Sequence, residues 1–204
     1  MRLLRGEDAL RVRWRNDGGW TREITREPST GESFDWRVSI AEVEVDGPFS
    51  AFDGCDRVLV LLEGAGMDLA NAATGATTEL RPDSRRSRFA GEVPIVATLL
   101  AGPTTDFNLI WRRDSSVATA RYVEGRHEIG AGGGAEVVAG AYLAHGSATL
   151  IDGTVAAAGD TFVSDPGERV HLDLDGSMVA FVVASLAAAE RGLTGLTVVE
   201  KDRD

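Results

Sequence analysis

The sequence is poor in the residues that build disulfides, metal sites and membrane spans. It has one cysteine and three histidines among 204 residues, so Cys55 has no partner for a disulfide within the chain. The most apolar run, residues 58–62, is far shorter than a bilayer span. The opening segment MRLLRGEDAL is too short and too charged for a signal peptide. We therefore expect a reduced, soluble, cytoplasmic protein that does not contact a membrane.

Basic residues are also in the minority, with 21 Lys and Arg against 32 Asp and Glu and a net charge of −11. Such a chain repels a phosphate backbone unless a local basic patch overrides its charge. The basic cluster Arg81 to Arg88 is interrupted by proline, aspartate and serine, and we expect a solvated loop there, with a nucleic-acid site as the alternative. No nucleic-acid partner is predicted, whereas an arginine in a cleft can still bind a small anion.

Glycine, by contrast, is abundant, and its 24 residues separate many short segments of alternating or continuous apolar character. This texture is typical of an all-β protein, and only residues 185–191 have the composition of a short helix. The strands expected in the first half are residues 9–14, 20–26, 34–45, 57–63, 66–71, 95–100 and 106–112. Those expected in the second half are residues 118–123, 136–144, 147–151, 161–164, 171–174 and 178–184.

The two halves share a weak internal repeat, in which a strand, a glycine turn and a second strand occur around Gly64 and again around Gly146. We therefore expect two cupin-like units, residues 1–115 and residues 116–204, with the GAGGG run at 130–134 as a flexible loop. The predicted fold class is an all-β bicupin, with two jelly-roll β-barrel units in one chain. An immunoglobulin-type sandwich is the alternative, but its cysteine pair and core-tryptophan pattern are missing.

Cupins that bind a metal use a His-x-His pair with a later Glu and a further His, and this pattern is absent. His127, His145 and His171 are widely separated in the sequence and are expected at the surface, so neither a metal nor a cofactor is predicted. The same scarcity of histidine argues against Ser-His-acid or Cys-His catalysis. Cys55 is flanked by carboxylates that raise the pKa of its thiol, which disfavours a reactive thiolate.

The segment WRNDGGWTREI, residues 14–24, places an Asn-Asp-Gly-Gly loop before an alternating polar stretch. Two adjacent glycines allow positive φ and the close approach of another group, which suits a ligand. An ordinary tight turn is the alternative. Strand alternation places Thr21 and Glu23 on one face and Arg22 on the other, so only part of the segment can contact one ligand. Asn16, Thr21 and Glu23 are the contacts predicted from this segment.

Arg57 opens an apolar strand and is our first choice for binding a carboxylate, which a guanidinium holds by two parallel hydrogen bonds. The alternative is an arginine that pairs with Asp53 or Asp56 and caps the preceding turn.

Two further strands supply the remaining predicted ligand contacts. Alternation places Ser39 with Arg37 on one face of its strand, directed either toward a site or toward solvent. Asp106 and Asn108 share a face and offer carboxylate and amide groups to whatever lies between them. The opposite faces are expected to be core, as are most of the aromatic side chains. The expected core residues are Trp14, Trp20, Trp36, Phe49, Phe52, Phe107, Leu109 and Trp111.

Four blocks of this sequence, taken in order, resemble the HutD/Ves family. They are WRNDGGWTREI at 14–24, DWRVSIAEVEVDGPFSAFDGCDRVLVLLEG at 35–64, FAGE at 89–92 and DFNLIWRR at 106–113. The resemblance implies a metal-free bicupin, usually dimeric, with a role in histidine utilisation and with N-formyl-glutamate or urocanate as ligand. The sequence departs from the family pattern at Asp17, where a third glycine is more common, and at Glu92, where Asp is more usual.

These residues are consistent with two main functions. The first is a non-catalytic protein that binds a small carboxylate and senses or modulates histidine utilisation. The second is a metal-independent cupin enzyme, an isomerase or hydrolase, with Glu23 or Asp106 as general base. A structural partner protein that docks through its acidic surface is a third alternative.

Overall fold

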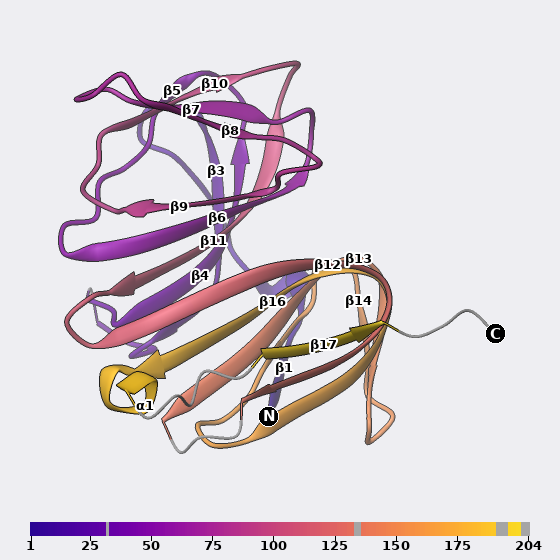
Figure 1. The fold of residues 1–204 in the computed structure, drawn as a ribbon. Coiled ribbons are helices and arrows are strands. Elements are labelled where there is room, and N and C mark those ends of the chain that lie inside the picture. The colour runs from indigo at the N-terminus through magenta and orange to yellow at the C-terminus, as the bar shows by residue number, and fades with distance from the viewer. Residues whose placement is uncertain (32, 133–135, 191–195, 201–204) are drawn as a thin grey trace. The chain divides into compact units, whose positions relative to one another are not determined.

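The computed structural model describes residues 1–31, 33–132, 136–190 and 196–200. The chain forms two compact units, the motif unit of Leu10–Asp114 and the terminal unit of Met1–Ala9 with Ser115–Asp204. Figure 1 labels most of their elements, which are nearly all β-strands; the helices of the described residues are η1 (Gly6–Asp8) and α1 (Leu186–Glu190). This confirms the all-β class predicted from the glycine-punctuated sequence.

The motif unit contains two antiparallel sheets. Its six-stranded sheet has the order β2 (Arg11–Arg13), β3 (Gly19–Glu27), β4 (Trp36–Val43), β11 (Thr104–Arg112), β6 (Cys55–Glu63) and β9 (Arg86–Ala90). Its four-stranded sheet has the order β5 (Gly47–Pro48), β10 (Ile95–Leu99), β7 (Met67–Asn71) and β8 (Thr77–Leu80). Apolar side chains from both sheets pack into one core, which includes Leu59 and Leu61 of β6 with Met67, Leu69 and Ile95.

The pairing register of the six-stranded sheet shows that several of its polar side chains lie on the same face as this core. Ser39 of β4 pairs with Asn108 of β11, which pairs with Leu59 of β6, so these three side chains share one face. We call this the inner face, because Leu59 belongs to the core of the motif unit. The alternate residues form the opposite face, where Phe107 and Trp111 are buried as predicted.

The terminal unit is built on one seven-stranded sheet with an apolar core. Its strands follow the order β1 (Arg2–Leu4), β15 (Thr161–Val163), β13 (Val137–Leu150), β16 (Arg169–Ser185), β12 (Ser116–Gly132) and β17 (Leu196–Glu200), with β14 (Val155–Ala157) paired to β13. Because β1 pairs with β15, the N-terminal segment joins this unit. The division of the chain therefore differs from residues 1–115 and 116–204 in its first nine residues and lies close to the predicted joint near Ser115.

Three glycines explain why the strands of the terminal unit are longer than predicted. Gly176 of β16 pairs with Gly125 of β12 on one side and with Gly146 of β13 on the other, and all three have positive φ. A Cβ added to Gly146 would lie 2.1 Å from the carbonyl oxygen of Asp175. The turn predicted at Gly146 is therefore wrong: this glycine sits within β13, and the predicted strands 136–144 and 147–151 are one strand.

Several other local expectations are corrected by the structure. Residues 130–132 of the GAGGG run extend β12 instead of forming a loop, and residues 133 and 134 lie outside the described residues. The predicted strands 171–174 and 178–184 are one strand, β16, and part of the basic cluster forms β9. The predicted helix is α1, with residue 191 outside the described range. No helix among the described residues is long and apolar enough to cross a membrane.

Candidate functional site

Arg57 occupies the centre of a buried polar cluster on the inner face of the motif unit. Its side chain is 7% exposed, and its Nε donates a hydrogen bond of 2.8 Å to Oδ1 of Asn108, with Nη2 bonded to the same oxygen. Within the described part of the chain no carboxylate lies within 4.0 Å of this guanidinium. Burial, with the nearby charge of Arg37, lowers the pKa of Arg57 to about 9, which leaves it protonated at neutral pH.

The alternative role for Arg57, as a cap paired with Asp53 or Asp56, does not fit this geometry. Alternation along β6 directs Asp56 to the face opposite Arg57. There Asp56 binds Arg88 at 2.7 Å and Arg113 at 3.0 Å. Within the described residues, neither Asp53 nor Asp56 therefore neutralises the positive charge of Arg57.

Aromatic rings cover the guanidinium of Arg57 and connect it to the opening loop. Its Cζ lies 4.8 Å from the ring centroid of Phe49 and 5.6 Å from that of Phe89. The ring of Phe49 meets that of Trp14 edge-on, with 6.3 Å between centroids. The indole Nε1 of Trp14 donates a hydrogen bond of 2.7 Å to Oγ1 of Thr21. The predicted contact Thr21 is thus linked to Arg57 through two packed rings, both partly buried against the core.

Asp106 and Thr104 complete the cluster on β11. The Asp106 side chain is fully buried, and its Oδ2 accepts a hydrogen bond of 3.1 Å from the Thr104 hydroxyl. Its Oδ1 is buried, and no described residue forms a hydrogen bond with it. Burial raises the pKa of Asp106 to about 7, against the opposing effects of Thr104 and of the Arg57 charge. A carboxyl group with one unpaired oxygen at this place can accept a proton or donate one to a bound group.

The opening loop forms the tight turn of a β-hairpin between β2 and β3, as the alternative prediction of an ordinary turn has it. Trp14 and Gly19 close the turn through the hydrogen bond from Trp14 N to Gly19 O. Oδ1 of Asn16 accepts from Gly18 N at 3.2 Å, so the exposed Asn16 side chain holds the turn. A Cβ on Gly19 would lie 2.1 Å from a carbonyl oxygen of β4, so this glycine allows close packing of two strands.

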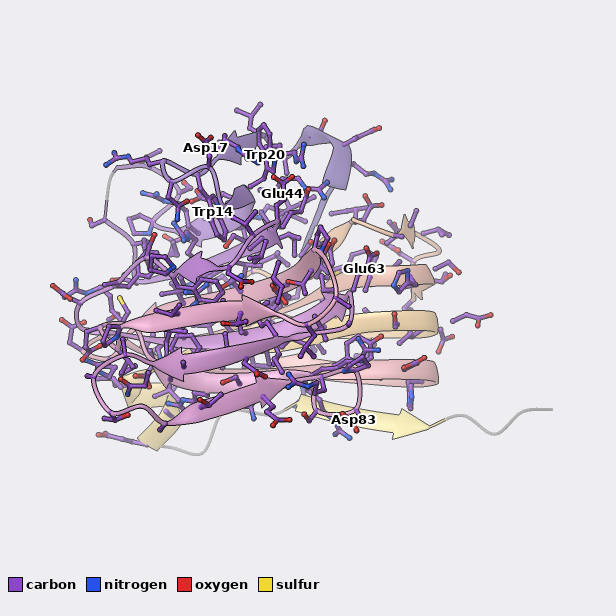
Figure 2. All side chains as sticks on the ribbon, turned by 90° about the horizontal axis from the view of Figure 1, so that it is seen from above. Trp14, Asp17, Trp20, Glu44, Glu63 and Asp83 are labelled. Atoms are coloured by element: carbon purple, nitrogen blue, oxygen red, sulfur yellow. The ribbon has the colours of Figure 1, made fainter. Side chains whose placement is uncertain are left out.

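The departure from the family pattern at Asp17 has a physical explanation. Asp17 has a φ of 55°, a left-handed conformation in which glycine is unstrained and aspartate is tolerated. Its carboxylate is exposed and accepts a hydrogen bond of 3.3 Å from Arg13. Figure 2 shows Asp17 with Trp14, Trp20 and Glu44 around this hairpin. The Asp17 side chain is 84% exposed, so its carboxylate lies in solvent.

Glu23 and Ser39 lie beside the Arg57 cluster on the inner face. Ser39 is 2% exposed, and it pairs with Glu23 of β3 on one side and with Asn108 on the other. Glu23 is half-exposed, and its Oε2 lies 3.9 Å from Nη1 of Arg37. Arg37 therefore faces inward, which answers the question that its sequence left open.

The structure brings six of the seven predicted ligand contacts to one face and leaves Asn16 at the exposed turn. The six are Thr21, Glu23, Ser39, Arg57, Asp106 and Asn108. Sequence reasoning missed Arg26, which a bulge between Glu23 and Thr25 rotates to the inner face opposite Arg37. It also missed Thr104, although the Thr-x-Asp spacing on an alternating strand places that hydroxyl beside the carboxylate.

The residues that other chemistries need lie apart from this cluster. Among the described residues, no three His, Cys, Asp or Glu side chains come together in a group that could hold a metal ion. His145 and His171 are exposed, and His127 is bonded to the carbonyl oxygen of Glu124. Cys55 is buried, and burial raises the pKa of its thiol. The chemistry available at the cluster is therefore that of arginine, amide, hydroxyl and carboxyl groups.

Comparison with known proteins gives consistent results. The model of the HutD family matches residues 6–182. An uncharacterized 21.2 kDa protein in the hutC 3′ region of Pseudomonas putida is 38% identical over 126 residues, 61% of this chain and 65% of that protein. Protein Ves of Citrobacter koseri is 40% identical over 114 residues, 54% of this chain and 58% of that protein. The matched part thus spans less than two thirds of both curated relatives.

Solved structures agree over most of the chain. HutD from Pseudomonas fluorescens SBW25, in a formate condition, superimposes with a TM-score of 0.78 at 28% identity, covering 90% of this chain and 98% of that one. An oxalate decarboxylase from B. subtilis superimposes with a TM-score of 0.57 at 11% identity, covering 99% of this chain and 89% of that one. The second likeness shows the fold alone, and together the two confirm the predicted cupin-like class.

Proposed function

The chain belongs to the HutD family, and from this premise we propose that its motif unit binds a small carboxylate through Arg57. The protein acts as a non-catalytic sensor or modulator of histidine utilisation, with N-formyl-glutamate or urocanate as the ligand to test first. The carboxylate takes two hydrogen bonds from the guanidinium edge. Asn108 and the rings of Phe49 and Phe89 hold that guanidinium in place.

One observation carries the proposal: a buried guanidinium has an amide oxygen as its hydrogen-bond partner where a carboxylate would neutralise it. Burying an arginine is costly unless its charge is paired. Asn108 occupies Nε and Nη2 of Arg57, and no hydrogen bond within the described residues involves Nη1. A carboxylate ligand supplies both the missing charge and the missing acceptor.

Thermal shift of the full chain tests this function. A ligand that binds only the folded protein raises its melting temperature. N-formyl-glutamate, urocanate, histidine, glutamate and formate form the first panel, with methylammonium chloride as the cationic control. We expect at least one carboxylate to raise the melting temperature in a concentration-dependent manner while methylammonium does not. If every carboxylate leaves it unchanged at millimolar concentration, the proposal fails, and docking through the acidic surface becomes the leading alternative.

Asp106 favours a second candidate, a metal-independent isomerase or hydrolase that acts on the same carboxylate. A pKa of about 7 is close to ideal for a general base at neutral pH, and the unpaired Oδ1 is free to accept a proton. Glu23, the other predicted base, is half-exposed and lies near Arg37. Mass spectrometry of a bound ligand after prolonged incubation separates the two candidates. An unaltered ligand supports binding alone, and turnover that Asp106→Asn abolishes supports the enzyme.

A further inference from the structure

Arg37 is a second arginine on the inner face, and it lies two strands from Arg57. In the register of the sheet, Ile110 of β11 pairs with Arg37 of β4 on one side and with Arg57 of β6 on the other. Their Cα atoms are therefore about 10 Å apart, since neighbouring strands are about 4.8 Å apart. The two positive charges repel each other, and the charge of Arg37 contributes to lowering the pKa of Arg57.

The surroundings of Arg37 repeat those of Arg57. The Cζ of Arg37 lies 5.3 Å from the ring centroid of Phe34 and 5.1 Å from that of Phe52, so two aromatic rings flank this guanidinium as well. Burial lowers the pKa of Arg37, as it does for Arg57. The rings supply an apolar wall and a weak attraction for the cation, but they supply no hydrogen-bond acceptor comparable to a carboxylate.

The hydrogen-bonding capacity of Arg37 is left largely unused. Its Nε is buried and has no hydrogen-bond partner among the residues that the structure describes. Glu23, which forms its ion pair, lies 3.9 Å from Nη1, beyond hydrogen-bond length, and its side chain is 43% exposed. The neighbouring Arg26 differs, because it donates to the carbonyl oxygens of Pro28, Gly31 and Ser33. Arg26 thus bonds to its own loop, whereas the Nε of Arg37 makes no hydrogen bond within the described part of the chain.

The charge balance of the inner face points the same way. Three arginines lie on this face, and within the described cluster they are accompanied only by the half-exposed Glu23 and the fully buried carboxyl group of Asp106. The three are Arg26, Arg37 and Arg57. This positive excess lies in a chain whose net charge is −11. A local positive cluster within an acidic protein attracts an anion and is stabilised by it.

We propose that Arg37 binds a second anionic group of the ligand, so that the preferred ligands are small dicarboxylates with one carboxylate on each arginine. This inference rests on the proposed carboxylate binding at Arg57 and adds the ligand class. The Nε and Nη donors of Arg37 form a fork that matches a carboxylate. The apolar side chain of Ile110 lies between the two arginines, opposite the hydrocarbon spacer of such a ligand.

Isothermal titration of the full chain tests this assignment. The probes are unbranched diacids from malonate to adipate, each compared with its own monomethyl ester, which keeps the spacer and removes one charge. We expect one diacid to bind at least about tenfold more tightly than its ester, because one hydrogen-bonded contact between charged groups raises the affinity by about tenfold or more. Arg37→Gln should abolish this preference and leave the affinity for the ester within about twofold, and Arg57→Gln should weaken both probes.

Arg88→Gln is the matched control, because Arg88 is an arginine of the same sheet that pairs with Asp56 on the opposite face. It should retain the preference for the diacid. Arg37→Lys keeps the positive charge and removes the fork, so it should reduce the preference without reducing ester binding. This variant remains informative if Arg37→Gln does not fold, which circular dichroism shows.

The two proposals fail in different ways. If the wild type shows no preference for any diacid, or if Arg37→Gln keeps it, the subsite at Arg37 is overturned. Carboxylate binding at Arg57 still stands in that case as long as Arg57→Gln loses the ester. If the wild type binds neither diacids nor esters, both proposals fall together.

Discussion

Arg57 differs from other arginines of the motif unit in the partner of its guanidinium. Arg81 binds Asp68 at 2.5 Å, and Arg88 binds Asp56 at 2.7 Å. These are exposed or half-exposed ion pairs of the kind that contribute little to stability. Arg57 is buried and bonded to the neutral amide of Asn108. A buried positive charge that is held by a neutral amide is the feature on which the proposed binding of an anion rests.

At the residue scale, Asp106 makes a prediction about pH. In the folded chain the pKa of Asp106 is about 7, and in the unfolded chain it returns to the ordinary value of 3.8. Between these values the folded chain keeps a proton that the unfolded chain has lost, so the free energy of unfolding falls as pH rises from about 4 to 7. Relative to Asp106→Asn, the wild type should lose roughly 4 kcal/mol across this interval and remain level above it.

Urea unfolding of both proteins at intervals from pH 4 to pH 8.5 measures this difference. Asp17→Asn provides the control, because the Asp17 carboxylate is exposed. The control should follow the wild type within about 0.5 kcal/mol at every pH. A constant difference between the wild type and Asp106→Asn from pH 4 to pH 7 would mean that Asp106 is ionised throughout.

The sequence predicts well on which face of the sheet a side chain lies, but it predicts less well which other side chains that side chain contacts. Alternation alone groups Thr21 with Glu23 and Asp106 with Asn108, and the structure confirms both pairs. It does not reveal that Arg26 joins them, because the bulge that rotates Arg26 depends on pairing with β4 and leaves no local sequence signal. Nor does it predict the partners of Arg57, since a guanidinium can reach in several directions from one strand.

At the scale of elements, the hairpin between β2 and β3 makes a prediction about glycine. Gly19 leaves room for the carbonyl oxygen of Glu42, which a Cβ would approach to 2.1 Å. Gly19→Ala should therefore lower the free energy of unfolding by about 2 kcal/mol or more, since two backbones must separate. Gly47→Ala is the matched control, because among the described residues no heavy atom beyond the chain neighbours lies within 4 Å of a Cβ placed there. Chemical denaturation compares the two, and equal effects would contradict the close approach at Gly19.

The strands themselves follow largely from the sequence, and the exceptions have physical causes. Segments such as β6 and β11 have apolar runs whose positions match the predicted strands. In the terminal unit, aligned glycines allow β13 and β16 to continue where a local pattern indicates a turn. Strand β9 lies in the basic cluster, where interrupted charge resembles a loop, yet its Ser87 and Phe89 face inward toward Leu59 and Arg57. Such pairings are tertiary effects that a local window does not contain.

At the scale of the whole molecule, the two units have different interiors. The core of the terminal unit consists of apolar side chains such as Leu143, Phe162 and Leu172. The inner face of the motif unit instead combines an apolar core with the buried polar cluster around Arg57. The proposed ligand site therefore lies in the unit that carries the family's sequence blocks.

This difference predicts where a ligand protects the backbone. Hydrogen exchange measured with and without a carboxylate that passes the thermal shift test should slow in β4, β6 and β11 of the motif unit. In β12, β13 and β16 of the terminal unit, the exchange rate should slow by less than about half the factor found in the motif unit. Protection that is strongest in the terminal unit would contradict the assignment of the site.

The global fold class is predictable because glycine spacing and alternation recur along the chain, whereas the path of the N-terminus is not. Residues 2–4 form β1 by pairing with β15, more than 150 positions later in the sequence. A three-residue strand has no periodicity of its own. Arg5 and Gly6 extend this contact by hydrogen bonds to Asp160. Long-range pairing therefore decides the membership of Met1–Ala9, and only the three-dimensional structure reveals it.

The central claim is that a carboxylate binds the buried guanidinium of Arg57, and isothermal titration of Arg57→Gln tests it most directly. The titrant is the carboxylate that raises the melting temperature most, and Arg88→Gln serves as the control of equal charge change. We predict that Arg57→Gln loses at least about 30-fold in affinity, since removing one partner of a buried charged hydrogen bond costs that much or more, while Arg88→Gln stays within about twofold. A folded Arg57→Gln variant that binds the carboxylate as tightly as the wild type would contradict the claim.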